Sequence, residues 1–152
     1  MHHAFIALNI QLVAATQQSY MLSIITITCV AEAGAVFAMS RLMKSKNQKG
    51  IAISAGTAAL LGVTEPSMFG VTIAARYPFI CSILSSGVAG VLIMIFKIYA
   101  VSLGSSGPLA FTIIPAQFWP QHYFCMALAF VLAFVSTLLI GKARQKKGLD
   151  VA

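Results

Sequence analysis

Gly62-Val63-Thr64-Glu65-Pro66 interrupts a stretch of the chain, residues 51–75, that is otherwise apolar. A carboxylate at membrane depth is costly, and such groups usually face a cavity or a partner. Pro66 lacks an amide hydrogen and Gly62 loosens the backbone, so a regular helix is not expected to continue through this point. Irregular backbone within a membrane is tolerated only where protein or a water-filled cavity surrounds it. The stretch therefore predicts a polar binding loop, with Glu65 inside it, in a membrane protein.

The composition of the whole chain supports a membrane protein. Of the 152 residues, 59% are hydrophobic and only 9% are charged, and the mean hydropathy is +0.91. Soluble domains carry about 25% charged residues. The net charge of +7 comes mostly from two clusters, residues 41–49 and 142–147, which flank apolar segments as cytoplasmic loops do. This pattern argues against a nucleic-acid-binding protein.

The cysteines do not indicate a site. Cys29, Cys81 and Cys125 stand singly in apolar segments, with neither metal-ligand nor disulfide spacing. We interpret them as small core residues. No catalytic residue, metal site or cofactor is predicted from the sequence.

Three segments are long and apolar enough to cross a bilayer, which takes about 20 residues. They are residues 20–40, 78–96 and 122–141, the first of them interrupted by Glu32. The expected fold is an all-α integral membrane protein with about three transmembrane helices.

The path of residues 51–75 is decided by the flanking cations. Lys46 and Lys49 precede the segment and Arg76 follows it. If both flanks are cytoplasmic, the segment enters and leaves the membrane on the same side. We therefore predict a re-entrant hairpin with Glu65 near its tip. Residues 101–121, rich in glycine and proline, are expected to form an outer loop or a partial re-entry.

Several passages together resemble one known family. They are His2-His3-Ala4-Phe5-Ile6-Ala7, the stretch from Thr57 to Gly70 around the Thr-Glu-Pro motif, Arg76-Tyr77-Pro78-Phe79-Ile80, and the glycine-rich stretch from Gly107 to Pro115. The chain resembles the sugar-transporting C domain (enzyme IIC) of bacterial phosphotransferase-system permeases, in the glucose and sucrose superfamily. The resemblance covers nearly the whole chain.

The resemblance implies a site and a substrate class. In that family the motif glutamate and a histidine of the His-His segment contact the hydroxyls of a sugar held in a cavity. Carried over, the sugar-binding residues are Glu65, Thr64 beside it, and one or both of His2 and His3. The pattern is most similar to sucrose-type members, with trehalose, β-glucoside and N-acetylmuramate members as alternatives.

The resemblance also implies partners. The chain corresponds to the second half of a C domain, so residues 1–145 are expected to belong to that domain and residues 146–152 to form a basic cytoplasmic tail. The expected partners are the N-terminal half of the C domain, the phosphoryl-carrying B and A domains, a second copy in a homodimer, membrane lipid and the sugar. The expected location is the bacterial inner membrane, as a multi-pass protein. The phosphoryl-carrying residues are not expected in this chain, so whether it counts as an enzyme stays open.

Alternatives remain at several points. Glu65 could instead bond backbone amides at the hairpin tip, and Thr64 could cap the following half-helix. Glu32, in Glu32-Ala33-Gly34 where the family often has Gln-Gly-Gly, could face the cavity or pair with Arg41. His122 and Trp119 are expected at the membrane interface. At the level of the whole protein, the alternatives are an ion-coupled secondary transporter fragment and a truncated, non-transporting membrane protein.

Overall fold

A computed structural model describes residues 11, 13–15, 18–102 and 107–146 of the chain. In the described residues the regular structure is helical, with one isolated antiparallel bridge between Ser19 and Ala100. The long helices are α2 (Tyr20–Leu42), α3 (Lys46–Leu60), α6 (Tyr77–Ile95) and α7 (Trp119–Lys146). The short elements are α4 (Glu65–Ser67), the π-helical η1 (Met68–Thr72), α5 (Ile73–Ala75), and the 3-10 helices η2 (Gly107–Thr112) and η3 (Ala116–Phe118). The all-α fold predicted from the sequence is confirmed.

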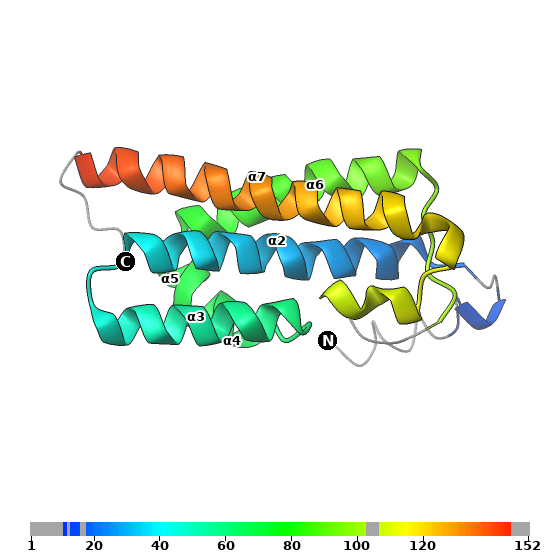
Figure 1. Ribbon diagram of the computed structural model, residues 1–152, viewed down its shortest axis with the longest axis horizontal. Coiled ribbons are helices and arrows are strands. Elements are labelled where there is room, and N and C mark those ends of the chain that lie inside the picture. Colours follow the sequence, from blue (N-terminus) through cyan, green and yellow to red (C-terminus); the bar gives the residue numbers. More distant parts are fainter. Residues whose placement is uncertain (1–10, 12, 16–17, 103–106, 147–152) are drawn as a thin grey trace.

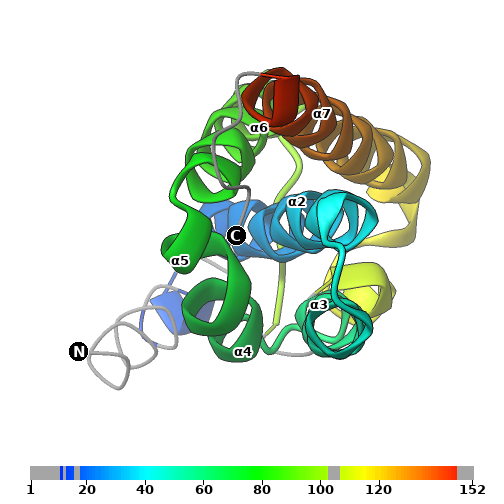
Figure 2. The same ribbon diagram turned by 90° about the vertical axis from the view of Figure 1, so that its left-hand side faces the viewer.

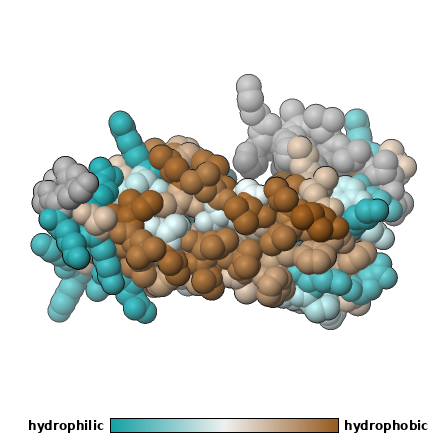
Figure 3. Space-filling model, turned by 90° about the horizontal axis from the view of Figure 1, so that it is seen from above, coloured by the Kyte–Doolittle hydropathy of each residue, from teal (hydrophilic) through white to brown (hydrophobic). Residues whose placement is uncertain are grey.

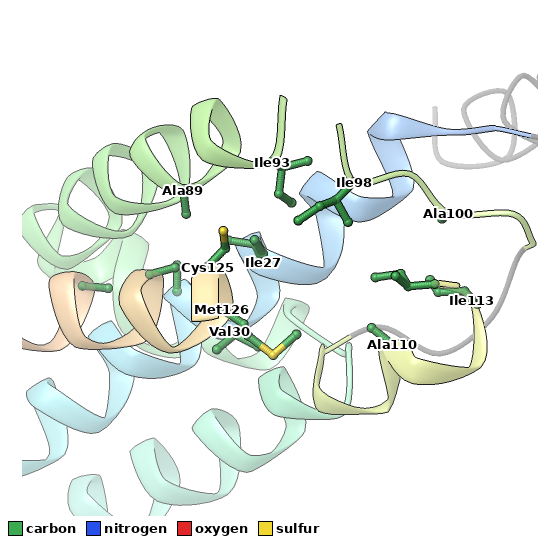
Figure 4. Packing of buried hydrophobic residues seen from close by; sticks show 14 of the residues in the cluster. Ile27, Val30, Ala89, Ile93, Ile98, Ala100, Ala110, Ile113, Cys125 and Met126 are labelled. Carbon is green, nitrogen blue, oxygen red and sulfur yellow. The ribbon is translucent and has the colours of Figure 1, made fainter. Parts of the chain in front are cut away.

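Helix α2 lies at the centre of the molecule. It packs against α7, α6 and α3, and Figure 2 shows these helices arranged around it. The main core joins Ile27 of α2, Ile93 of α6 and Cys125 of α7, close to Ile98 and Ile113 of the connecting segments (Figure 4). Many other core positions are alanines, and small residues allow membrane helices to approach closely.

Three helices of the described residues are long and apolar enough to cross a membrane. They are Tyr20–Leu42, Tyr77–Ile95 and Ala116–Lys146. Figure 3 shows an apolar band on the surface between two hydrophilic ends. The three spans predicted at residues 20–40, 78–96 and 122–141 are therefore confirmed, and the chain is a multi-pass membrane protein.

Side-chain contacts bring three helix ends together at one end of the molecule. The guanidinium of Arg144, in the last turn of α7, lies 5.2 Å from the ring centre of Tyr77, the first residue of α6. Gln145 Nε2 donates a hydrogen bond of 3.1 Å to the carbonyl oxygen of Leu42, at the end of α2. The cations near these ends, including Arg76, therefore gather on one side of the apolar band.

Helix α3 and the segment that follows it form a helical hairpin. α3 ends in a Schellman motif, in which Gly62 N–H bonds to Ala59 O and Val63 N–H bonds to Ala58 O, both at 3.0 Å. Gly62 has φ 95°, a conformation that glycine adopts at little cost. The chain then returns through α4 and η1, which contact α3, and continues into α5 (Figure 1). The geometry is that of a hairpin, and its re-entrant insertion in a membrane stays a prediction.

Residue Arg76 separates this hairpin from α6. It has φ 62° and ψ −52°, a sparsely populated conformation for a residue with a side chain. Pro78 then stands in the first turn of α6, where its missing amide hydrogen is harmless. The backbone therefore changes direction here, so α5 and α6 are separate helices.

The segment between α6 and α7 is packed against the helices. In η2 and just after it, Ala110, Ile113 and Ile114 are buried, and η2 contacts both α2 and α3. Tyr123 Oη donates to Pro108 O at 2.8 Å and Trp119 Nε1 donates to Ile114 O at 2.9 Å. The expected outer loop is thus an ordered cover over one end of the core in residues 107–118.

Candidate functional site

Glu65 is the first residue of the returning arm of the hairpin. It begins α4 directly after the turn, with Thr64 as the preceding cap residue and Pro66 in the first turn. A carboxylate is favourable at a helix N-terminus because the backbone amides there point toward it. The side chain of Glu65 is exposed and that of Thr64 is half-buried. The fold therefore presents the carboxylate at the surface of the hairpin, next to its tip.

From the sequence, Glu65 could have bonded backbone amides at the hairpin tip and Thr64 could have capped the following half-helix. Neither bond is observed among the described residues. Within residues 18–102 and 107–146, the Glu65 carboxylate forms no hydrogen bond and no ion pair. Thr64 makes no side-chain capping bond, while its carbonyl oxygen accepts from Met68 N–H at 2.8 Å. Among the described residues, neither side chain makes a bond that holds the hairpin together. His2 and His3, the other predicted sugar contacts, lie outside the described residues.

A second carboxylate, Glu32, lies behind the same segment. It stands in the middle of α2 and is 3% exposed. Its Oε1 atom accepts from Ser67 Oγ at 2.8 Å and from Thr72 Oγ1 at 3.4 Å. Each hydroxyl shares its one hydrogen with a carbonyl oxygen of its own segment, Thr64 O at 2.8 Å from Ser67 Oγ and Met68 O at 3.3 Å from Thr72 Oγ1. The pairing with Arg41 considered from the sequence is not observed among the described residues, and Arg41 is exposed. Glu32 bonds the motif hairpin because the end of α4 and η1 place two hydroxyls against the middle of α2.

His122 is a core residue, although the sequence analysis placed it at the membrane interface. It is 1% exposed, and its Nε2 atom lies 3.2 Å from Thr26 Oγ1 across the contact between α7 and α2. The hydroxyl of Thr26 also donates to Ser23 O at 2.7 Å. With its one hydrogen used there, Thr26 can accept from Nε2–H of the neutral ring. His122 therefore joins two spanning helices.

Ser67 and Thr72 were not predicted as site residues from the sequence. Both are buried hydroxyl residues of the motif hairpin, and each bonds the carboxylate of Glu32. Their sequence spacing of five residues gives no sign of a shared partner in a regular α-helix. No group of three or more histidine, cysteine, aspartate or glutamate side chains in the described part of the chain could hold a metal ion.

These observations define a class of protein, a multi-pass membrane protein with a broken, polar hairpin packed on its spanning helices. The chain belongs to the phosphotransferase system EIIC family, whose model matches residues 1–87. It is 38% identical over 152 residues to a sucrose-specific EIIBC component of Vibrio alginolyticus, covering 97% of this chain. It is 32% identical over 147 residues to a trehalose-specific EIIBC component of Bacillus subtilis, covering 96% of this chain.

The similarity extends over only part of these relatives. The chain spans 31% of the length of each of these two proteins. A sucrose-specific EIIBCA component of Pediococcus pentosaceus is 31% identical over 145 residues, which cover 93% of this chain and 22% of the relative. No solved structure matches the chain significantly. The family membership predicted from the motifs is confirmed.

Proposed function

We propose that this chain supplies part of the sugar-binding and translocation region of a phosphotransferase-system permease, specific for sucrose or a related glucoside. The observation that carries the proposal is the exposed carboxylate of Glu65, which makes no hydrogen bond or ion pair with the described residues. A carboxylate can accept hydrogen bonds from two neighbouring sugar hydroxyls, and such charge-assisted bonds are stronger than neutral ones. Thr64 and the histidines His2 and His3 complete the proposed set of sugar contacts.

The surroundings of Glu65 suit a sugar. Phe69, one turn further along the same segment, is 70% exposed. A pyranose or furanose ring has an apolar C–H face as well as hydroxyl groups, so a carboxylate beside an aromatic ring offers a partner for each. The names of the relatives in Vibrio alginolyticus and Bacillus subtilis support a glucoside of the sucrose or trehalose class.

In this proposal the sugar is phosphorylated by partners. The relatives are EIIBC and EIIBCA components, which supports B and A domains as the source of the phosphoryl group. The chain would bind and orient the sugar, in the inner membrane of a bacterium. Lipid, neighbouring helices or a second copy would cover the exposed apolar side chains of α6 and α7.

A hybrid permease tests the proposal. In this hybrid, the 152 residues replace the aligned segment of the sucrose-specific EIIBC component of Vibrio alginolyticus. We expect phosphoenolpyruvate-dependent phosphorylation of radiolabelled sucrose or trehalose by membranes that contain the hybrid and the general phosphotransferase proteins. Membranes in which the hybrid inserts but phosphorylates neither sugar would contradict the proposal. Accumulation of unmodified sugar driven by an ion gradient would favour the secondary transporter instead.

The hairpin is proposed to be re-entrant, and labelling from each side of the membrane tests this. Single cysteines are introduced by Lys46→Cys and Arg76→Cys, with the native cysteines replaced by alanine. Because both positions lie beside helix ends that meet in the structure, we expect both to react from the cytoplasmic side only. Val101→Cys, beyond the far end of α6, serves as the control and should react from the opposite side. Labelling of position 76 from the same side as position 101 would exclude a re-entrant hairpin.

A further inference from the structure

Glu32 is the only acidic side chain buried in the described part of the chain. It lies in the middle of a helix that is apolar enough to span a membrane, where a carboxylate is expensive unless it has partners. The bonds to Ser67 and Thr72 both reach its Oε1 atom. They link α2 to the segment that carries Glu65.

The π-helical turn explains why two hydroxyls reach one oxygen. In a regular α-helix of 3.6 residues per turn, residues five apart are separated by about 140° around the axis. In a π-turn the hydrogen bonds span five residues, which brings such residues close to the same side. Here Ile73 N–H bonds to Met68 O, which closes the turn. The turn therefore aligns Ser67 and Thr72 toward α2.

The same turn gives the segment two different faces. The inner face contains Ser67, Val71 and Thr72, all of them buried. The outer face contains Glu65 and Phe69, both of them exposed. Rotation of the segment about its axis would exchange these faces, so whatever fixes the inner face also fixes the direction of the Glu65 carboxylate.

We propose that Glu32 is a positioning residue for the sugar site. Its Oε1 atom accepts the hydroxyl hydrogen bonds of Ser67 and Thr72, and this holds the returning arm of the hairpin in the rotation that presents Glu65 outward. The effect of Glu32 on sugar binding rests on the proposed function. The contact between Glu32 and the hairpin does not depend on that function.

The function of Glu32 requires an acceptor oxygen rather than a negative charge. Both partners are neutral hydroxyls, and the side-chain amide of glutamine offers an oxygen at the same reach. Glu32→Gln should therefore keep the contact, whereas Glu32→Ala removes it.

Cysteine labelling of the full chain in membranes tests the contact without any sugar. Val71 is 2% exposed on the inner face, so a cysteine introduced by Val71→Cys reports release of the arm. The native cysteines are replaced by alanine. We expect slow maleimide labelling in the parent and in Glu32→Gln, and about tenfold faster labelling in Glu32→Ala, which corresponds to about 1.4 kcal/mol. Ser67→Ala should act in the same direction as Glu32→Ala.

Combining two of these substitutions separates the contact from a general loss of structure. If Glu32 acts through Ser67, adding Ser67→Ala to Glu32→Ala should change the labelling rate by less than twofold. Equal helix content by circular dichroism shows that the variants fold. Unchanged labelling in Glu32→Ala, or labelling of Glu32→Gln as fast as that of Glu32→Ala, would overturn the inference.

Sugar affinity, measured with the hybrid permease, tests the positioning. Sucrose binding should weaken about tenfold in Glu32→Ala and stay within about twofold of the parent in Glu32→Gln. An affinity that is unchanged in Glu32→Ala, despite faster labelling, would overturn a positioning role. A parent hybrid that binds no sugar would contradict the proposed function, while the labelling experiment would still decide whether Glu32 holds the hairpin.

Discussion

Glu65→Gln is expected to weaken sugar binding by the hybrid permease about tenfold to a hundredfold, or about 1–3 kcal/mol. The carboxylate of Glu65 is exposed and forms no bond within the described part of the chain, so its replacement removes no contact that holds the hairpin. The affinity should fall because two charge-assisted hydrogen bonds to sugar hydroxyls are weakened. Equilibrium binding of radiolabelled sucrose to membranes measures it, and the amount of inserted protein should stay equal.

The chain offers a matched control for this substitution. Glu32→Gln makes the same chemical change at the α2 carboxylate that bonds the hairpin, where we expect an effect of less than about twofold because glutamine keeps the acceptor. Equal losses in the two variants would mean that charge in this region matters generally, and not that Glu65 touches the sugar. If Glu65→Gln binds sucrose within twofold of the parent, Glu65 does not contact the sugar.

The spanning helices could be predicted from the sequence because their signal is local. An apolar run of about 20 residues is readable from composition alone. The expected spans 20–40, 78–96 and 122–141 lie within the candidate spans Tyr20–Leu42, Tyr77–Ile95 and Ala116–Lys146, apart from the final residue of the second. The break at Gly62 and Pro66 was equally readable, since glycine and proline restrict the backbone at their own positions.

The surroundings of Glu32 could not be predicted, because they depend on how distant segments pack. Nothing local to residue 32 indicates a partner 35 residues further along, and the bond to Ser67 exists only because the hairpin returns against α2. The π-turn has no residue signature that separates it from an α-turn. His122 illustrates the same limit, since its partner Thr26 lies 96 residues away on another helix.

Of the predicted sugar contacts, the structure describes Glu65 and Thr64. Among the described residues, neither side chain makes the structural bond that the sequence left open. The motif identified the segment, while the fold showed which of its faces is exposed. His2 and His3 stay predictions from the resemblance.

Gly107→Ala is expected to lower the free energy of unfolding by about 2–4 kcal/mol, through left-handed strain and overpacking together. Gly107 has φ 71°, and a Cβ atom there would collide with the carbonyl oxygen of Leu60. Leu60 is the last residue of α3, five positions before Glu65, so relief of the collision must move either η2 or the hairpin tip. Sugar binding by the hybrid permease should weaken as well.

Unfolding in mixed micelles, followed by circular dichroism, measures the stability, and Gly87→Ala is the control. Gly87 lies within α6, and a Cβ atom there would have nothing within 4 Å. Alanine is the better helix former, so this change should leave stability unchanged or raise it by about 0.5–1 kcal/mol. The same change in the free energy of unfolding at both glycines would show that the close approach of Gly107 to Leu60 does not affect stability. A loss of stability at Gly107 alone would show that the 3-10 segment and the hairpin tip stabilise each other. Weaker sugar binding by the same variant would show that the site around Glu65 depends on a segment more than 40 residues away.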